Sequence, residues 1–512
     1  MLTKAKIEKI LSNRIEELSS SRLPHYSLLS GIEKASVRIV KALKNGEKIV
    51  LVGDYDVDGV SSSAIMKLFF EKLGYELEVV IPDRFKDGYG LSLSVLERIK
   101  ADLLITVDNG ITSFDAAEEC VKKGTDLIIT DHHTPLCGND GEYVLPKALA
   151  IVNPKTSPDF PFKEICGAEV AWYLCAAIKG ELKLDIDLRE FTDILCVAVI
   201  ADVMPLTHMN RTLVNMGLKR LNAAQKPFSK ALKKFFNRNF GSEDIAFQIA
   251  PRLNAAGRMA HAETAYRFLV SENENEAYDL LLKLDGYNNL RKETEKEAVE
   301  SIKEVDDGFI VLKGDYHEGV VGIIASRLVH RFKKPAIVLS RKDGILKGSG
   351  RSLGNIDLFS LVNECGDLLE GFGGHKMACG LSVKEENFDE FRRRLNEKIR
   401  KYSKEDFFIE DYVLGELPFR EIDTELLDLL KKYEPYGEGN PKPKFTAAAK
   451  VEHVQNLKEN HFKLILSQDD ILLPGVIFRY DGGFDEEIEF KFSVGENSYY
   501  GRSVQLLIEE IL

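Results

Sequence analysis

The stretch Lys48-Ile-Val-Leu-Val-Gly-Asp54-Tyr-Asp56-Val-Asp58-Gly59-Val60 decides how the chain around it folds. Its apolar run predicts a buried strand, and three carboxylates at alternate positions follow before a helix begins. Three acids within five residues repel one another unless a cation neutralises them. The stretch therefore indicates either a solvated acidic turn or part of a metal site.

A calcium-binding loop is a third interpretation, because the stretch satisfies the start of the pattern D-x-D-x-D-G. Such a loop needs a bidentate glutamate at its twelfth position and a helix in front of it. Here the twelfth position is Ile65, and an apolar strand comes first. The calcium loop is excluded.

The length of 512 residues predicts three or four domains. The composition, 44% hydrophobic and 29% charged, is that of a globular protein, and no apolar run reaches the roughly 20 residues that span a bilayer. The N-terminus lacks the apolar core of a signal peptide. Seven cysteines without a C-x-x-C pair indicate reduced, intracellular thiols and neither a zinc site nor a disulfide framework. We therefore expect a cytoplasmic protein without a membrane segment.

The net charge of −13 argues against indiscriminate binding of polyanions. It leaves room for a local basic groove, because only charges within a Debye length of about 8–10 Å act strongly.

Outward from the opening stretch, apolar runs alternate with helical patterns. Strands are predicted at residues 49–53, 78–82, 103–107, 127–130 and 149–152, and helices at 61–73, 94–100 and 114–123. Continuous apolar strands that alternate with helices are typical of a parallel, doubly wound α/β sheet.

Acids follow several of these strands directly. Asp54, Asp83, Asp108 and Asp131 each stand at the carboxyl end of a predicted strand, where open α/β sheets bind ligands. His132 and His133 come next, and Asp202 follows the apolar helix at 195–201. Carboxylates with imidazole suit Mn²⁺ or Fe²⁺ somewhat better than Mg²⁺. Because the candidates exceed the ligands of one octahedral ion, we expect two metals about 3.5–4 Å apart.

Several motifs of the chain together resemble those of a known superfamily. The set D-Y-D-V-D-G (54–59), P-D-R-F-K-D-G-Y-G (82–90), V-D-N-G-I (107–111), T-D-H-H (130–133) and A-D-V-M-P-L (201–206) resembles the DHH phosphoesterase superfamily. Further on, P-R-L-N-A-A-G-R-M (251–259), G-V-V-G-I-I-A-S-R (319–327), K-G-S-G-R-S (347–352) and F-G-G-H (372–375) are similar to its bacterial single-strand-specific exonucleases. The resemblance covers residues 45–512.

The resemblance implies the roles of the candidate residues. Asp56, Asp58, Asp108, His132 and Asp202 match metal ligands, with Asp54 beside them; which of Asp54 and Asp56 ligates directly stays open. His133 matches a residue near the scissile phosphate, so the catalytic candidates are Asp108, His132 and His133. Since Asp108 projects from a middle strand, we hypothesise that it bridges both ions.

The resemblance also implies the activity: a Mn²⁺- or Mg²⁺-dependent 5′→3′ exonuclease that cuts single-stranded DNA to nucleoside 5′-monophosphates in DNA repair and recombination. A 5′-phosphorylated single strand is the expected substrate. A single-strand-binding protein or a helicase is the candidate partner, and a monomer is expected. One alternative is a phosphodiesterase of cyclic dinucleotides or short oligonucleotides; another, from a different class, is an inactive strand-binding scaffold. The C-terminal barrel and helical connector disfavour the first, and the intact set of acids disfavours the second.

Two motifs supply the first candidates for DNA contact. In the loop at 82–90, Arg84 fits a phosphate and Tyr89 fits a base, unless the arginine pairs with Asp83 or Asp87. In 251–259, small residues flank Arg252 and Arg258 and allow a close approach to the strand, unless the segment is an interhelical contact with paired arginines.

A second α/β unit at 307–402 supplies the others. Ser349, Gly350 and Arg351, opposite Gly374 and His375, resemble a pocket for the terminal 5′ phosphate. A Gly-Ser-Gly segment by itself also fits a purely structural role, as a bulge or bend in a strand.

The predicted organisation is a helical lead-in at 1–35, a DHH-type catalytic domain at 36–206, a helical connector at 207–306, the second α/β (DHH-associated) domain at 307–402 and an OB-fold β-barrel at 407–512. The barrel is implied by about five short alternating segments. OB-folds bind single strands by aromatic stacking and a basic groove. The candidates are Lys442, Lys444, Lys450, Lys458, Lys463, Arg479, Arg502, Phe445, Phe462, Phe478 and Tyr480, and alternation predicts that at least half of the aromatics are core residues.

Overall fold

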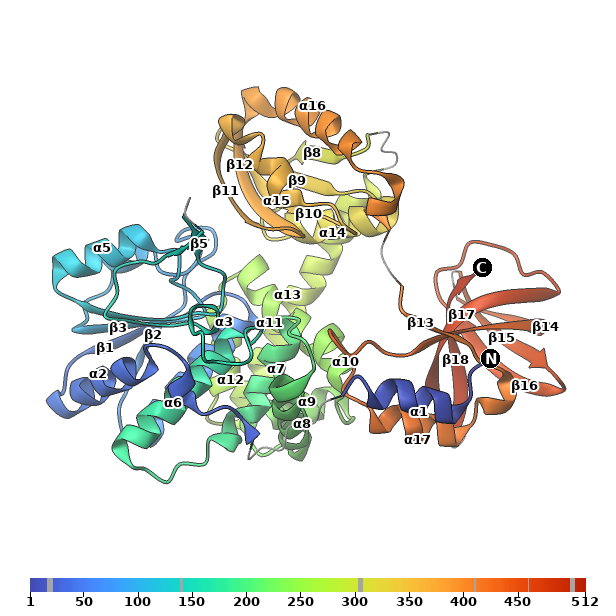
Figure 1. Ribbon diagram of the computed structural model, residues 1–512, viewed down its shortest axis with the longest axis horizontal. Coiled ribbons are helices and arrows are strands. Elements are labelled where there is room, and N and C mark those ends of the chain that lie inside the picture. The colour runs from blue at the N-terminus through green and yellow to red at the C-terminus, as the bar shows by residue number, and fades with distance from the viewer. Residues whose placement is uncertain (16–21, 139–140, 303–306, 409–410, 459, 498–501) are drawn as a thin grey trace.

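The computed structural model describes residues 1–512 except 16–21, 139–140, 303–306, 409–410, 459 and 498–501. Figure 1 shows an α/β domain beside a group of helices, a second α/β unit above them, and a barrel to one side. The α/β class, the parallel sheet and the C-terminal barrel predicted from the sequence are confirmed.

The catalytic sheet is parallel throughout, with strand order β2-β1-β3-β4-β7. The strands are β1 (Ile49–Val52), β2 (Glu78–Val80), β3 (Leu103–Val107), β4 (Asp126–Thr130) and β7 (Ala150–Val152). The helices are α2 (Ile32–Asn45), α3 (Val57–Lys72), α4 (Leu93–Glu97), α5 (Phe114–Lys123), α6 (Gly167–Leu182) and α7 (Thr192–Ala201). A small hairpin, β5 (Leu136–Cys137) and β6 (Tyr143–Val144), lies between β4 and β7.

Both faces of this sheet are covered, as its continuous apolar strands require. Ile49 and Leu51 belong to the core that α2, α3 and α6 share, whereas Val50 and Val52 pack with α4 and α5. The carboxyl edge of the sheet is consequently the free edge at which polar side chains gather.

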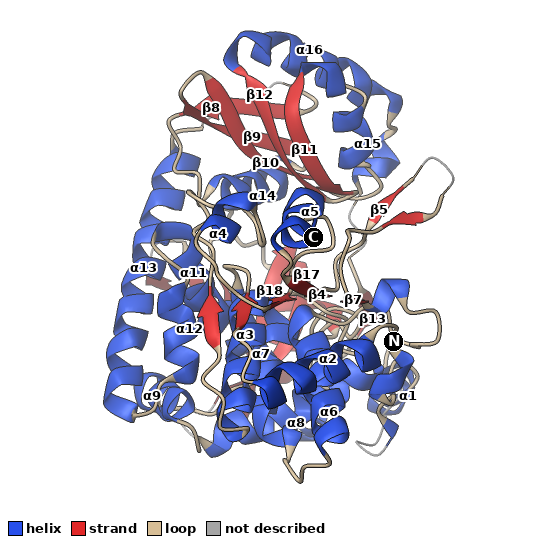
Figure 2. Cartoon of the chain, turned by 90° about the vertical axis from the view of Figure 1, so that its left-hand side faces the viewer, coloured by secondary structure: helices blue, strands red, loops and turns tan. Residues whose placement is uncertain are grey.

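The helices that follow α7 share the hydrophobic core of the first α/β domain. They comprise α8 (His208–Ala223), α9 (Pro227–Phe236), α10 (Ser242–Asp244), a π-helical turn (Ile245–Ile249), α11 (Ala250–Met259), α12 (Glu263–Val270) and α13 (Glu274–Glu300). The apolar face of this group packs against α3 and α7. The 27-residue α13 leads up to the second α/β unit (Figure 2).

The second unit has a mixed sheet of order β11-β12-β10-β9-β8. Its elements are β8 (Ile310–Gly314), α14 (Val321–Phe332), β9 (Ala336–Lys342), β10 (Ile345–Arg351), α15 (Leu358–Asn363), β11 (Leu369–His375), β12 (Ala378–Lys384) and α16 (Phe388–Lys398). In Figures 1 and 2, α14 lies on the side of the catalytic domain and α16 on the far side.

The barrel closes because β14 pairs with β15 on one side and with β17 on the other. Its strands are β14 (Lys444–Lys458), β15 (His461–Gln468), β16 (Ile471–Ile477), β17 (Glu487–Asn497) and β18 (Ser503–Ile511), with β13 (Val413–Glu416) alongside β14 and α17 (Thr424–Lys432) beneath. Five strands close the barrel, as predicted.

The predicted lead-in at 1–35 is not a unit of its own. Helix α1 (Lys4–Ser12) buries Ile7 and Leu11 in the core of the barrel, and Figure 1 shows α1 beside α17. By contrast, α2 begins at Ile32 within the catalytic core. This long-range contact has no local signal in the sequence. The other domain ranges stay predictions, and the boundary at 306 lies outside the described residues.

Across the part of the chain that the structure describes, every helix is too short or too polar to cross a membrane.

Candidate active site

The acids of the opening stretch lie at the carboxyl edge of the sheet, each held by a different local element. Asp54 follows β1, Asp56 is the N-cap of α3 and accepts a hydrogen bond from the Gly59 amide (3.1 Å), and Asp58 lies in the first turn of α3. Asp108 follows β3 with φ at +61°. A non-glycine residue is uncommon in this left-handed region, and such residues cluster at functional sites.

The ligand atoms gather in overlapping groups. Asp54, Asp56 and Asp108 form one group with ligand atoms within 4.8 Å of one another, and Asp58, His132 and Asp202 form a second. A third group, Asp108, His132 and His133, shares one member with each of them. The His132 Nε2 atom lies 3.2 Å from Asp108 Oδ1, 3.6 Å from Asp58 Oδ2 and 3.5 Å from Asp202 Oδ2. Asp108 therefore stands between the two groups, where a bridging carboxylate would stand.

Four buried polar atoms point to a missing cation. Among the described residues, Asp54 Oδ1, Asp108 Oδ1, His132 Nε2 and Asp202 Oδ2 have no hydrogen-bond partner. Burying such atoms without partners is costly, and in native proteins each needs an explanation. Oxygen atoms and one imidazole nitrogen suit Mn²⁺ or Mg²⁺. The residues present fit divalent metal ions.

The pKa values of the clustered carboxyls are raised because these acids are buried close together. Burial, followed by repulsion from Asp56, raises the pKa of Asp54 well above its usual value, and burial with Asp58 does the same for Asp108. Burial and then Asp58 raise the pKa of Asp202 to about 9. Without a cation, the Asp202 carboxyl therefore holds its proton at neutral pH.

The other two strand-end acids have different tasks. Asp131 accepts hydrogen bonds from the amides of Ile111, His132 and His133 and from the His133 ring, with Nδ1 at 2.8 Å. Asp83 accepts from the amides of Phe85 and Lys86 and so shapes its own loop. Among the described residues, neither acid belongs to the groups of metal-ligand atoms, and backbone amides engage carboxylate oxygens of both.

His133 carries a positive charge at the site. Burial alone would lower its pKa, but the hydrogen bond to Asp131 raises it to about 9. The Tyr89 hydroxyl donates to the Asp108 carbonyl (3.1 Å) and lies 3.2 Å from His133 Nδ1. Tyr89 thus reaches the catalytic cluster through its hydroxyl, rather than offering only a ring for a base.

The metal-free chain should lose stability as pH rises from about 7 to about 8.5. In this window the folded chain retains the protons of Asp202 and His133, whose pKa values are both raised to about 9, whereas in the unfolded chain the carboxyl and the imidazole have already released theirs. The folded state then binds more protons, so the free energy of unfolding falls with pH. Thermal melting in EDTA measures this slope.

Saturating Mn²⁺ displaces those protons, so the slope should flatten in its presence. Asp202→Asn removes one titrating group and should flatten the EDTA slope in part. A stability in EDTA that rises with pH would contradict the pKa directions.

Three arginines from three parts of the chain have no ion-pair partners among the described residues and lie close to one another. Arg84 of the catalytic domain stacks on Tyr55, 4.1 Å from the ring centre. Arg258 at the end of α11 donates to the Gly319 carbonyl at 3.3 Å. Burial, then the charges of Arg84 and Arg351, lower the pKa of Arg258 to about 10, while Asp56 raises it. The arginines thus lie close enough to repel one another, as a phosphate site without its anion does.

The second α/β unit contributes Arg351 and a bare sheet surface. Lys347, Ser349 and Arg351 share one face of β10, and their partners include Ser382, Gly380 and Ala378 of β12. A cavity of about 370 Å³ separates this face from Tyr55, Arg84 and Tyr89. His375 of β11 lies opposite Ala378 of β12. Burial, then the charges of Arg351 and His133, contribute to lowering its pKa.

The glycines of this pocket act differently from the prediction. β10 is paired on both sides, so the amides of Gly348 and Gly350 are engaged within the sheet. A Cβ at Gly350 would lie 2.9 Å from Cys379 Sγ, because this position faces the core. Gly374 has φ at +147° and would meet the Ala378 carbonyl at 2.3 Å. These glycines allow close strand packing rather than binding the phosphate directly.

Arg252 is the substrate candidate that the structure does not bring to the site. Its guanidinium pairs with Asp285 at 2.8 Å and donates to the Gln248 carbonyl at 2.7 Å, and the residue is buried. The segment is here the interhelical contact with a paired arginine.

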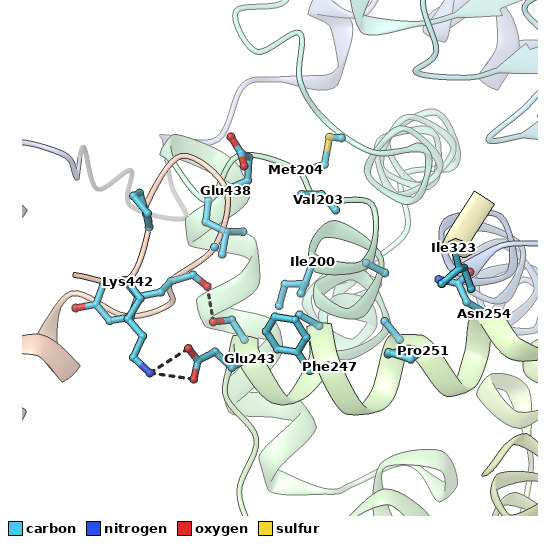
Figure 3. A pocket seen from close by; sticks show the side chains of 18 of the residues that line it. Ile200, Val203, Met204, Glu243, Phe247, Pro251, Asn254, Ile323, Glu438 and Lys442 are labelled. Carbon is cyan, nitrogen blue, oxygen red and sulfur yellow. Dashed lines mark hydrogen bonds and ion pairs between the residues drawn. The ribbon is translucent and has the colours of Figure 1, made fainter. Parts of the chain in front are cut away.

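An apolar groove beside Asp202 went unpredicted. It has a volume of about 510 Å³ and lies between the end of α7, the π-helical turn, α11, the start of α14 and the loop at 436–442 (Figure 3). Phe247 and Val203 line it with 73% and 63% of their surfaces exposed. Val203 has φ at +56°, an outlier for a β-branched residue. The sequence signal was an apolar pair, Val203-Met204, directly after a metal-ligand candidate.

Most basic candidates of the barrel are already paired. Lys442 pairs with Glu243, Lys444 with Asp411 and Glu509, Lys450 with Glu452 and Glu486, and Arg502 with Asp428 and Glu496. Phe445 is a core residue, whereas Phe478 is 58% exposed. The side chain of Lys458 lies outside the described residues.

Comparison with known proteins agrees with this architecture. Models of the DHH family N-terminal domain, the DHHA1 domain and the RecJ OB domain match residues 48–199, 306–401 and 415–510. Together with the carboxylate–histidine cluster, they define a DHH-family phosphoesterase.

Relatives and solved structures narrow the family. The chain is 34% identical to the RecJ single-stranded-DNA-specific exonuclease of Dickeya dadantii over 97% of the chain and 92% of the relative, and 38% identical to that of Bacillus subtilis over 88% of the chain and 58% of that longer relative. The crystal structure of Thermus thermophilus RecJ in complex with Mn²⁺ superposes with a TM-score of 0.82 at 31% identity, covering 94% of this chain and 72% of that one. A complex with Mg²⁺ gives a TM-score of 0.77 at 29% identity, covering 94% and 70%. The chain belongs to the RecJ family.

Proposed function

We propose that this chain is a single-stranded-DNA-specific 5′→3′ exonuclease that uses two divalent metal ions and releases nucleoside 5′-monophosphates. One observation carries the proposal: the metal-ligand candidates gather in overlapping groups, and among the described residues four of their buried atoms have no hydrogen-bond partner. Arg84, Arg258 and Arg351, which have no ion-pair partner among the described residues, lie close to one another and near Asp56. Acids at a metal centre and cations a short distance away suit hydrolysis of one phosphodiester next to a second, terminal phosphate.

Bound Mn²⁺ or Mg²⁺ would supply activation of a water molecule at neutral pH and stabilisation of the charge on the attacking and leaving oxygens. Asp54, Asp56 and Asp108 would hold one ion and Asp58, His132 and Asp202 the other, with Asp108 shared. His133, which is charged and oriented by Asp131, stabilises negative charge that develops on the phosphate or gives a proton to the leaving 3′ oxygen.

The direction of degradation follows from the arginines. Arg84, Arg258 and Arg351 would bind the 5′ phosphate as a charged, forked group that carboxylates do not occupy. Ser349 lines the cavity from β10, and His375 on β11 lies close enough to Arg351 for the charge of that arginine to lower its pKa. Because the charge of Asp56 also acts on the pKa of Arg258, the bound terminus would lie near the metal-ligand candidates, and cleavage there would yield a mononucleotide.

The apolar groove suits the strand on the other side of the scissile phosphate. Asp202 connects it to the metal cluster, and Phe247 offers an exposed ring. Aromatic faces bind successive bases of a single strand irrespective of sequence.

Phe247→Ala should raise the KM for single-stranded DNA roughly fivefold to a hundredfold, since one base stack contributes about 1–3 kcal/mol. The kcat should change little, because Phe247 is not among the metal ligands. Steady-state kinetics on a labelled oligonucleotide measure both. Phe408→Ala is the matched control, because Phe408 is 70% exposed and does not line the groove. Equal KM values for the two variants would remove the groove from the DNA path.

One assay tests the function as a whole. The chain is incubated with Mn²⁺ and 5′- or 3′-labelled single-stranded DNA, duplex DNA, RNA or a cyclic dinucleotide. Immediate release of the 5′ label as a mononucleotide from single strands supports the proposal. Cleavage of the cyclic compound alone supports the phosphodiesterase instead, and binding without cleavage supports the inactive scaffold.

The wider setting belongs to the same proposal. A role in DNA repair and recombination accords with the family. A single-strand-binding protein or helicase as partner, the monomeric state and the cytoplasmic location stay predictions.

A further inference from the structure

The first turn of α6 contacts two of the candidate metal ligands. The Gly167 amide donates to Asp58 Oδ2 at 2.5 Å and the Ala168 amide donates to Asp58 Oδ1 at 2.9 Å. These amides belong to the helix terminus, where N–H groups have no partner within the helix, and they lie at the positive end of a 16-residue helix. The carboxylate plane of Asp58 is thereby fixed, and each oxygen keeps a lone pair for a cation.

The same turn makes room for Asp108. A Cβ at Gly167 would lie 2.5 Å from Asp108 Cβ and 2.6 Å from Asp108 Oδ1, distances that real side chains do not show. The φ of Gly167 lies outside the left-handed region, so its backbone conformation suits any residue. The glycine is needed for the space that the Asp108 carboxylate occupies.

A buried glutamate fixes the turn from behind. Glu169 is completely buried and its Oε2 accepts from the Cys166 amide at 2.9 Å. Among the described residues, its Oε1 has no hydrogen-bond partner. Glu169 is not among the described residues that line the cavity at Arg84 or the apolar groove, so neither of these accounts for it.

We propose that residues 166–169 are a positioning element of the metal centre, which sets the carboxylates of Asp58 and Asp108 in their metal-binding orientation before a cation arrives. Groups that orient metal ligands commonly change metal affinity 10- to 100-fold, roughly, when they are removed. Gly167 and Glu169 act here through Asp58 and Asp108 and are positioning residues. The inference rests on the proposed metal site but not on the proposed substrate.

Gly167→Ala tests the element. Alanine is the better helix former, so α6 should persist, while Asp108 must move away from the new methyl group. We expect Mn²⁺ to bind roughly 10- to 100-fold more weakly, with a melting temperature in EDTA close to that of the unaltered chain. Electron paramagnetic resonance of free Mn²⁺ measures binding to the full chain without DNA.

Gly286→Ala in α13 is the matched control, since a Cβ there meets nothing within 4 Å. It should bind Mn²⁺ as the unaltered chain does. If Gly167→Ala also binds Mn²⁺ normally, or lowers only the melting temperature in EDTA, Gly167 is a packing residue and the proposal is overturned.

If Gly167→Ala does not fold, two variants at Glu169 test the proposed positioning element instead. Burial raises the pKa of Glu169 to about 8, so glutamine is close to its neutral form and keeps an acceptor for the Cys166 amide. Glu169→Gln should retain Mn²⁺ affinity, whereas Glu169→Ala should lose about tenfold. Equal affinities for the two would overturn the proposal. Failure to cut DNA with this Mn²⁺ pattern intact would refute the proposed substrate alone.

Discussion

Asp108→Asn is expected to lower kcat/KM on single-stranded DNA by at least roughly a thousandfold, which corresponds to about 4 kcal/mol of transition-state stabilisation. Asp108 lies between the two ligand groups, so its loss weakens both metal positions at once. Asparagine tolerates the left-handed backbone at this position, whereas alanine would strain it. Exonuclease assays and Mn²⁺ titration of the same preparation measure the two effects.

The folded state should survive this change and become more stable in EDTA, because one acid leaves a cluster in which acids repel one another. Asp159→Asn, which removes the same charge from an exposed loop, is the control and should leave activity unchanged. Mn²⁺-dependent cleavage by correctly folded Asp108→Asn at the normal rate would remove the bridging role.

Arg351→Ala should abolish most of the preference for a 5′-phosphorylated end. A charge-assisted hydrogen bond contributes about 1.5–3 kcal/mol, so the preference should fall roughly tenfold to a hundredfold. Arg351 has no ion-pair partner among the described residues, and one of its nitrogens would lie 3.0 Å from a Cβ at Gly322 in the first turn of α14. Competition between phosphorylated and unphosphorylated oligonucleotides measures the preference.

Two further variants sharpen this experiment. Arg351→Lys keeps the charge and loses the planar fork, so it should restore the preference only in part. Arg341→Ala removes an exposed arginine of the same sheet that pairs with Asp315 and Glu385, and it should leave the preference unchanged. An unaltered preference in Arg351→Ala would place the terminal phosphate elsewhere.

The sheet and the metal ligands could be predicted because their signals are local. Apolar strands of four or five residues alternate with helices, and each ligand candidate stands at a fixed offset from the end of one of them. A parallel sheet then brings Asp54, Asp108 and His132 to one edge whatever the details of the packing. The resemblance supplied the order of the motifs and the barrel.

The predictions that failed, and the contacts that were not predicted, depended on residues that are distant in the chain. Arg252 and Arg258 stand six residues apart in one motif, yet Asp285 pairs with the first and leaves the second for the site. The Gly350 amide is engaged within the sheet because β9 and β12 pair with β10 on both sides. Helix α1 joins the barrel more than 400 residues away, as the ion pair between Lys432 and Glu8 illustrates.

Local sequence patterns thus predict which residues are candidates for binding metal. These are the carboxylates and imidazoles that follow directly after the predicted strands. Tertiary structure alone decides which of them stay available, because hydrogen bonds from distant backbone amides engage Asp131 and orient Asp58. Among the described residues, packing across domains likewise leaves Arg84, Arg258 and Arg351 without ion-pair partners and creates the groove at Phe247. Availability is a property of neighbours in space, and short-range sequence patterns do not encode those neighbours.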